Sequence, residues 1–222
     1  MAEVADLLER PIYGVAQVDR LLGLSPGTAR RWIDGYRRAG KDYPPVVRIE
    51  PTGEELVTWG EFVETRLLSE YRDAGVPLIR MRPAIDRLRE QFHPRYPLAH
   101  SRPFLDIHGR ELVLRAQEEV GLERELLLVV VRNEQIVLSP PAEQFVRSAE
   151  FDKQTQVVER LRPVADIDEV VIDPSASSVN PSCAAFAQRS SPSKSVLARR
   201  SMESPSSMTS TVTWSRQRFA TS

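Results

Sequence analysis

The sequence is poor in the residues that build disulfides and metal sites. It has one cysteine and three histidines in 222 residues. A single cysteine excludes an internal disulfide framework and any zinc site with several cysteine ligands, and it is typical of a reducing, cytoplasmic setting. The three histidines follow no zinc-binding spacing; they are His93, His100 and His108. We therefore expect no metal site and a cytoplasmic location.

Long hydrophobic runs are missing too. No stretch of about 18 consecutive apolar residues occurs, which is the length that a membrane span requires. The first residues, MAEVADLLERPIYG, are too acidic and too poor in apolar residues for a secretory signal. We therefore expect no membrane contact.

Motifs that carry catalysis or bind nucleotides are absent as well. There is no nucleophile elbow, no phosphate-binding loop and no glycine-rich dinucleotide turn. Glu118 and Glu119 adjoin, but neighbouring residues on a helix do not face each other, so a solvated face is the better interpretation. The sequence therefore predicts a protein that is not an enzyme and that needs no cofactor.

Charge divides the chain into two parts. Apolar residues make up 41% and charged residues 27%, as in an ordinary globular protein of one or two domains. Residues 175–222 carry six lysines and arginines but one acidic residue, so this tail has a net charge of +5 and residues 1–174 have −6. Fifteen serines and few large apolar residues in the tail predict disorder.

Two helices joined by a tight turn are predicted near the N-terminus. Val15, Val18 and Leu22 recur at helical spacing and Gly23 is a stop signal. Ser25 then suits an N-cap and Pro26 the first helical position of a second helix that reaches Arg38. Its predicted buried stripe is Ala29, Trp32, Ile33 and Tyr36. This pattern indicates a helix-turn-helix.

The second helix of such a unit lies in the major groove of DNA, with its first residues near base edges. Arginine suits guanine because its planar fork matches two acceptors. The predicted base-contacting residues are Thr28, Arg30 and Arg31, and the predicted phosphate contacts are Arg37, Arg38, Lys41 and Arg48. The alternative is a helical hairpin with a solvated basic face, which the net negative charge of residues 1–174 mildly favours.

A wing and two further helices complete the predicted N-terminal domain, residues 1–92. Residues 46–50 and 55–59 read as two strands flanking the turn sequence Pro-Thr-Gly-Glu. Helices are predicted over 59–74 and 78–92. The buried face of the first contains Phe62, Val63, Leu67 and Tyr71, and the second exposes Arg80, Arg82, Arg87 and Arg89. Trp32 and Trp59 are interpreted as core anchors rather than stacking platforms.

Residues 93–174 are predicted to form a smaller, strand-rich domain. A hairpin is expected over 104–114, with its turn at His108 and Gly109. The apolar run 126–131 is either a buried strand or part of a buried helix. Further strand candidates are 135–139 and 156–161, and the segment 167–174 closes the ordered body. The predicted fold class is α+β: a winged helix-turn-helix, a strand-containing domain and a disordered tail.

Three segments together carry a family resemblance: YGVAQVDRLLGLSPGTARRWIDGY, VTWGEFVETRLLSEYRDAGVPLIRMRPAIDRLREQF and RYPLAHSRPFLD. They resemble the VapB-type antitoxins of mycobacteria and other actinobacteria. The resemblance covers roughly residues 11–174. It implies a winged helix-turn-helix similar to that of the MerR regulators, binding to double-stranded operator DNA of its own operon, and neutralisation of a PIN-domain ribonuclease toxin. The DNA contacts that it implies lie at the start of the second helix and are Ser25, Thr28, Arg30 and Arg31. A homodimer would read two half-sites about one helical turn apart.

After Pro174 the sequence departs from that family, in which a compact helical module is expected. One hypothesis is that the tail is a frameshifted reading of this module. In a frame moved back by one base, suitable wobble bases let the codons from Ser175 encode RQFGEP and those from Met208 encode DDFDRDLVEAAVRYE. A second functional hypothesis also stays open: a protein-interaction module that binds a toxin and does not read DNA.

Overall fold

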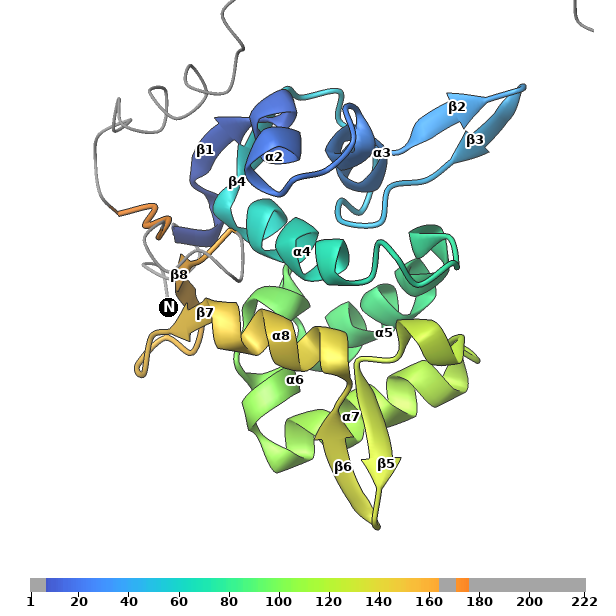
Figure 1. Ribbon diagram of the computed structural model, residues 1–222, viewed down its shortest axis with the longest axis vertical. Helices are drawn as coiled ribbons and strands as arrows, with labels where there is room; N and C mark the ends of the chain where they lie inside the picture. The colour runs from blue at the N-terminus through green and yellow to red at the C-terminus, as the bar shows by residue number, and fades with distance from the viewer. Residues whose placement is uncertain (1–6, 164–170, 176–222) are drawn as a thin grey trace, which may run out of the picture. The chain divides into compact units, whose positions relative to one another are not determined.

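The computed structural model of the chain describes residues 7–163 and 171–175 (Figure 1). The N-terminal elements are a strand, a helix pair, a hairpin, a second strand and a long helix. Their bounds are β1 (Pro11–Gly14), α2 (Val15–Leu21), α3 (Thr28–Asp34), β2 (Tyr36–Arg38), β3 (Lys41–Tyr43), β4 (Leu56–Thr58) and α4 (Trp59–Glu70).

The elements that follow are mainly helical, with two further hairpins. Their bounds are η1 (Leu78–Met81), α5 (Arg82–Phe92), η2 (Pro97–Ala99), α6 (Arg102–Leu105), α7 (Ile107–Glu119), η3 (Arg124–Leu126), β5 (Val129–Arg132), β6 (Gln135–Leu138), α8 (Pro140–Ser148), β7 (Ala149–Phe151) and β8 (Val158–Leu161). The described strands pair antiparallel as β1–β4, β2–β3, β5–β6 and β7–β8. Helices with small antiparallel sheets confirm the α+β class.

The predicted helix-turn-helix is confirmed as α2 and α3, but α3 is shorter than expected. It ends at Asp34 because Gly35 takes a φ of +75°, where a side chain would meet the Tyr43 carbonyl oxygen at 2.6 Å. Residues 36–38 form β2 instead of continuing the helix. The predicted N-cap at Ser25 is also wrong, because α3 starts two residues later, after Gly27.

The hairpin expected over 46–59 is wrong. Residues 46–50 form bends rather than a strand. Residues 56–58 do form a strand, but it pairs with β1, in register Gly14 to Leu56. The hairpin lies earlier, as β2 and β3, and projects away from the helices in Figure 1.

Helix α4 confirms the third predicted helix and lies at the centre of the described structure. Thr58 caps its start by accepting from the Glu61 N–H, and Glu61 reaches back to the Thr58 N–H. The four predicted core residues on it, Phe62, Val63, Leu67 and Tyr71, are all buried. Trp59 is fully buried and its Nε1 donates to the Val158 carbonyl at 2.6 Å, so it is a core anchor as predicted.

The hairpin predicted over 104–114 is wrong, because these residues form α6 and α7. The Asp106 side chain accepts from the Gly109 N–H at 3.0 Å and so caps α7. Gly109 lies against α6, where a Cβ would meet the Arg102 carbonyl oxygen at 1.9 Å. Val113 and Ala116 are buried at helical spacing. The glycine marks a close helix contact rather than a turn.

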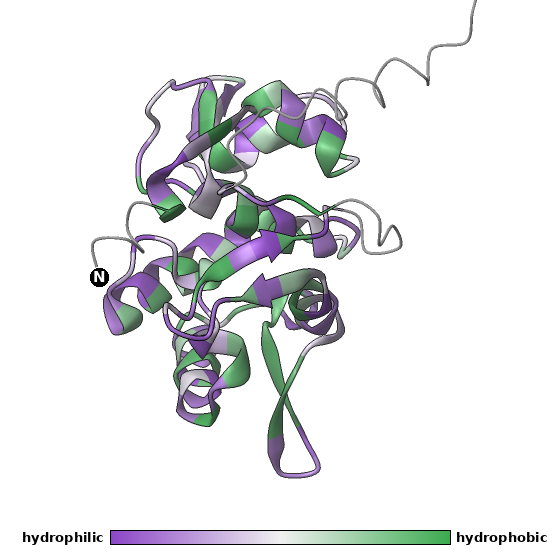
Figure 2. Cartoon of the chain, turned by 90° about the vertical axis from the view of Figure 1, so that its left-hand side faces the viewer, coloured by the Kyte–Doolittle hydropathy of each residue, from purple (hydrophilic) through white to green (hydrophobic). Residues whose placement is uncertain are grey.

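The remaining strand predictions are partly confirmed. The apolar run 126–131 is split between η3 and β5, and residues 135–139 contain β6. The strands of this hairpin are apolar and its turn is polar (Figure 2). Helix α8 was not foreseen.

Of the segment 167–174, the structure describes 171–174, where Ile172 bridges Leu161. The predicted tail lies outside the described residues, apart from Ser175.

The hydrophobic core continues across residue 92. Helix α4 packs against α8 and η2, and α5 packs against α7. The hydroxyl of Tyr71 on α4 lies 3.1 Å from the Leu127 carbonyl and 3.0 Å from the Ser139 hydroxyl. Among the described residues, no helix has the length and apolar character needed to cross a bilayer.

Candidate nucleic-acid interface

One buried carboxylate fixes the turn between α2 and α3. Asp19 is 5% exposed and accepts from the Gly27 N–H at 2.7 Å and from the Ala29 N–H at 2.8 Å. These are free N–H groups at the start of α3, so Asp19 takes the capping role that the sequence suggested for Ser25. The carbonyl of Asp19 also accepts from Leu24 at 2.8 Å. The angle between α2 and α3 therefore depends on this side chain.

The other end of α3 is held by the segment that follows β3. The Trp32 carbonyl accepts from the N–H groups of Val46 at 2.7 Å and Val47 at 3.0 Å. The Asp34 carboxylate accepts from the N–H groups of Thr52 at 2.6 Å and Gly53 at 3.1 Å. Both ends of α3 are thus fixed by hydrogen bonds from outside the helix.

Arg48, a predicted phosphate contact, is instead an interior residue. It is 3% exposed, and its Nε and Nη2 both reach the Glu61 carboxylate, at 2.8 and 3.2 Å. Its Nη1 lies 3.0 Å from Asp34 and 2.6 Å from the Thr52 hydroxyl, and Nη2 donates to the Leu56 carbonyl at 2.9 Å. All of its donor groups are used inside the protein. The predicted phosphate contact of Arg48 is therefore wrong.

The buried ion pairs shift both partners toward their charged forms. Burial alone would raise the pKa of Asp34, but the N–H groups of Thr52 and Gly53 and the Arg48 guanidinium outweigh it, so this pKa is lowered. Burial would lower the pKa of Arg48, but Glu61 and Asp34 outweigh it and this pKa is raised. The Asp34–Arg48–Glu61 cluster therefore connects the end of α3 to the start of α4 as a charged, hydrogen-bonded unit.

Two arginines predicted to be exposed on the helix over 78–92 also hold this segment. Arg82 donates to the Pro45 and Ile49 carbonyls, the latter at 2.7 Å. Arg89 donates to the Val47 carbonyl and its side chain is 10% exposed. They bind main chain of this protein, so the prediction of exposure is wrong for both, whereas Arg80 is exposed.

The four DNA contacts predicted for the start of the second helix lie together around the start of α3, but they differ in availability. Thr28 is half-buried. Ser25 and Arg31 are exposed, and Arg31 donates to the Thr28 hydroxyl at 2.9 Å. Arg30 is half-buried and ion-paired with Glu55 at 2.5 Å. Arg31 is therefore free to reach outward, whereas Arg30 first has to leave Glu55.

The β2–β3 hairpin presents the other three predicted phosphate contacts. Tyr36 and Tyr43 stack at its base, with ring centroids 4.6 Å apart and planes inclined by 3°. Ala39 and Gly40 both have positive φ, which gives the tight two-residue turn that suits a twisted hairpin. Near the turn Arg37 pairs with Asp42 at 3.3 Å, and both side chains are more than 70% exposed.

Two cations face each other at the tip of this hairpin. Arg38 and Lys41 are exposed and occupy directly opposite positions in the register. Neither has an ion pair with an acidic residue of the described part of the chain. Like charges in opposite positions destabilise a strand pair, so the hairpin keeps an electrostatic cost that a bound anion would remove.

Sequence reasoning missed the residues that position α3. Asp19, Asp34 and Glu61 are buried acids, and their role depends on contacts far apart in the chain. Glu61 alone had a local signal, because Thr58 followed three residues later by glutamate is a capping box. Arg20, at the exposed end of α2, is a further cation for which the described residues supply no ion pair.

Comparisons with known proteins agree with this geometry. A family model described as "Putative DNA-binding HTH domain" matches residues 11–85. The uncharacterized protein Rv2308 of Mycobacterium tuberculosis is 45% identical over 80% of this chain and 75% of its own length. "Putative antitoxin VapB45" of the same organism is 30% identical over 74% of this chain and 73% of its own length.

A solved structure shares the fold. The crystal structure of Rv2018 from Mycobacterium tuberculosis superposes with a TM-score of 0.57 at 26% identity, covering 74% of this chain and 75% of that one. The match to the helix-turn-helix model includes α2, α3, the β2–β3 hairpin and α4. This chain belongs to the family of helix-turn-helix proteins that includes Rv2308 and VapB45.

Proposed function

We propose that this protein is a sequence-specific DNA-binding regulator of the antitoxin type that represses its own operon. In this proposal α3 enters the major groove and the β2–β3 hairpin acts as a wing on the adjacent backbone, as in MerR-like regulators. The observation that carries the proposal is the facing pair Arg38 and Lys41 at the hairpin tip, which has no acidic partner among the described residues.

The DNA contact proposed for each side chain follows from what that side chain already binds within the protein. Arg31 is exposed at the start of α3 and would reach a guanine edge, with discrimination of about 1–3 kcal/mol against a wrong base. Ser25 and Thr28 would contact neighbouring groups of the groove. Arg37, Arg38 and Lys41 would contact phosphates, which adds affinity without sequence information. Arg30 contacts DNA only if Glu55 releases it.

The proposal includes two protein partners. A second copy of the chain would place two α3 helices in successive major grooves, because half-sites one turn apart suit a twofold dimer. The other is a PIN-domain ribonuclease toxin. The relative named VapB45 supports the antitoxin assignment. No catalytic role is proposed for any residue.

The test is fluorescence anisotropy of the full chain on DNA from upstream of its own gene, beside scrambled DNA of equal length and composition. Titrations at several salt concentrations separate phosphate contacts from base contacts. We expect tighter binding to the upstream DNA, with a steep negative dependence on salt. Arg31→Ala is expected to reduce the ratio of specific to non-specific affinity by about 5- to 100-fold.

Arg124→Ala is the matched control, because Arg124 is also exposed but lies in η3, beyond the matched helix-turn-helix domain. It should leave both affinities unchanged. Equal and weak binding to both DNAs, or an unchanged ratio in Arg31→Ala, would contradict the proposal.

A protein-interaction module that does not read DNA is the second candidate. The β5–β6 hairpin favours it, because Val131 is 59% exposed and its edges have no strand partner among the described residues. If upstream DNA is not bound while a PIN-domain toxin encoded beside this gene is captured by the chain, this candidate replaces the first.

The tail hypothesis is tested separately, on the coding DNA. A frame moved back by one base after Pro174 should read through without a stop codon and encode a helical module. A stop codon or an unrelated sequence in that frame would contradict the hypothesis. The DNA-binding proposal does not depend on the result.

A further inference from the structure

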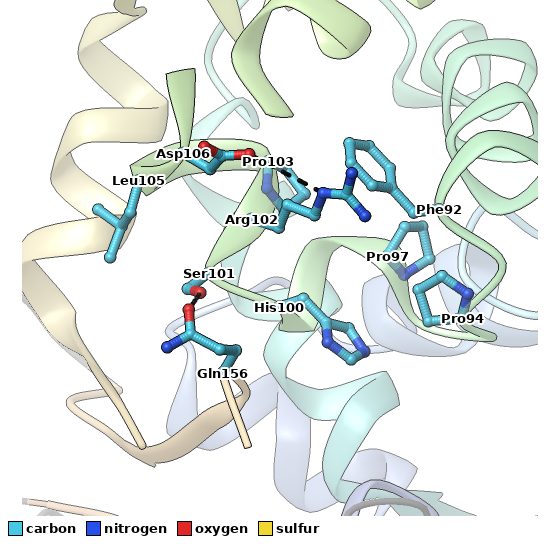
Figure 3. Close-up of a pocket in the computed structure, with 10 residues that line it drawn as sticks. All are labelled: Phe92, Pro94, Pro97, His100, Ser101, Arg102, Pro103, Leu105, Asp106 and Gln156. Atoms are coloured by element: carbon cyan, nitrogen blue, oxygen red, sulfur yellow. Dashed lines mark hydrogen bonds and ion pairs between the residues drawn. The ribbon is translucent and has the colours of Figure 1, made fainter. Parts of the chain in front are cut away.

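A cavity of about 540 Å³ opens beside the segment that joins α5 to α7 (Figure 3). The residues that line it include Phe92, His100, Arg102, Leu105 and Asp106. None of them belongs to α3 or to the β2–β3 hairpin. The volume suits a small molecule, and a few polar groups converge on mostly apolar walls, as in many ligand sites.

Arg102 supplies a cation with unused donors. Its guanidinium lies over the Phe92 ring, 5.2 Å from the centroid, and extends toward it in Figure 3. Within the described residues, its one ion pair is a long contact of 3.9 Å between Nε and the Asp106 carboxylate, and its side chain makes no hydrogen bond there. Asp106 is engaged elsewhere, because it caps α7 through the Gly109 N–H. The guanidinium is thus oriented by the ring and free to bind a carboxylate with two hydrogen bonds.

The apolar walls suit a flat ligand body. Pro94, Pro97 and Phe92 gather on one side of Arg102 in Figure 3, and Leu105 lies on the opposite side. Leu105 is 54% exposed, although it is a large apolar side chain. A ligand in the cavity would cover it, which is favourable because apolar surface leaves water.

The polar end of the cavity has one unsatisfied atom. The Ser101 hydroxyl donates to Gln156 Oε1 at 2.5 Å, and Gln156 Nε2 donates to the Lys153 carbonyl at 3.0 Å, so these two groups are satisfied. His100 Nε2 is buried and has no hydrogen-bond partner in the described ranges. Burial lowers the pKa of His100, so the ring is neutral near pH 7. Arg102 is therefore the one positive charge among the lining residues near that pH.

We propose that this cavity binds a small carboxylate with a flat apolar body. The carboxylate pairs with Arg102 and the body lies between the Phe92 side and Leu105. The proposal is independent of DNA binding, since its residues lie outside the α3 surface.

The test uses 2-naphthoate and its neutral analogue 2-naphthamide as probes, with binding to the full chain measured by isothermal titration calorimetry. We expect the wild type to prefer the carboxylate. Arg102→Met should weaken 2-naphthoate at least 10-fold and leave 2-naphthamide nearly unchanged, because only the carboxylate uses the guanidinium. Arg124→Met, which removes an exposed arginine that does not line the cavity, is the matched control and should change neither affinity.

A second variant tests the place of binding. Leu105→Trp enlarges an exposed side chain at the rim and should reduce the affinity for both probes at least 10-fold, with an unchanged circular dichroism spectrum. Three results would overturn the proposal: no binding of 2-naphthoate at millimolar concentration, equal loss of both probes in Arg102→Met, or full binding in a folded Leu105→Trp.

Discussion

Two arginines of the same N-terminal domain, Arg48 and Arg38, have opposite environments. Arg48 is 3% exposed and gives every donor to groups of this protein, among them Asp34 and Glu61. Arg38 is exposed and faces Lys41, without an acidic partner among the described residues. The sequence gives both the same local appearance, a basic residue near a helix-turn-helix. What separates them is the set of acceptors that the fold brings within reach.

The difference shows how one domain uses charge for two purposes. The Asp34–Arg48–Glu61 cluster fixes α3 to α4 and consumes its charge internally. The hairpin tip leaves its charge unneutralised and exposed. A rigid α3 and a free cationic surface are both needed for reading DNA, because precise placement and electrostatic attraction are separate requirements.

The largest expected effect follows removal of the buried arginine. Arg48→Met keeps a long side chain but leaves Asp34 and Glu61 buried without their cation. We expect the free energy of unfolding to fall by about 3–5 kcal/mol, the range for breaking a buried pair by removing one partner. Urea denaturation at pH 7, followed by circular dichroism, measures it.

Arg38→Met is the matched control for this change. It removes the same group from an exposed site, so its effect on unfolding should stay within about 0.5 kcal/mol. A loss below about 1 kcal/mol in Arg48→Met, or equal losses in the two variants, would show that burial does not separate these arginines.

Local signals were enough to predict the helix pair and α4. Helical spacing at Val15 and Val18, a stop at Gly23 and the apolar face of the helix that contains Phe62 and Leu67 are all signals that operate within a few residues. The errors arose where a local signal has two meanings. Gly109 suggested a turn, but its missing side chain serves the close contact of α6 and α7. Gly35 ends α3 and starts a hairpin, although the residues after it continue the helical pattern.

The candidate surface was predictable only in part. Residues at the start of α3 and at the hairpin follow from the chain order of a helix-turn-helix. The structure brings them to exposed positions, except for Thr28 and Arg30, which are half-buried. The interior role of Arg48 was not predictable, because its partners lie 13 and 14 residues away and meet it only after folding. Sequence gives the charge of a side chain, and tertiary contacts decide whether it is available.

A second, intermediate effect concerns Glu64, a buried acid that is only partly paired. Glu64 is fully buried, and its Oε1 accepts from the Leu98 N–H at 3.1 Å. Its Oε2 has no hydrogen-bond partner among the described residues, and the Arg89 Nη2 lies 3.7 Å from it. Burial raises the pKa of Glu64 from 4.5 to about 7, against the opposing effects of Arg89 and the Leu98 N–H. The folded protein therefore holds a proton that the unfolded chain has released between these two values.

Stability should consequently fall as the pH rises from about 5 to about 7, since the native state binds more protons there. Glu64→Gln removes this titration, so the difference in unfolding free energy between wild type and variant should change by up to about 3 kcal/mol across this window. Urea denaturation at pH 5, 6 and 7.5 measures it. Titrating groups that both proteins share, such as His100, cancel in the difference. A constant difference would contradict the raised pKa.

The smallest effect on stability, and the sharpest on binding, is expected at the hairpin tip. Arg38→Ala combined with Lys41→Ala removes two like charges that face each other, so the unfolding free energy should rise by a few tenths of a kcal/mol or stay unchanged. If each residue contacts one phosphate, the slope of log affinity against log salt should become shallower by about 1.8, because each phosphate contributes roughly 0.9. Specificity should persist, since phosphates carry no sequence information.

The Arg124→Ala variant should keep the wild-type slope. An unchanged slope in the double variant would mean that the tip is merely a solvated face, and the contrast between Arg38 and Arg48 would then be one of burial alone.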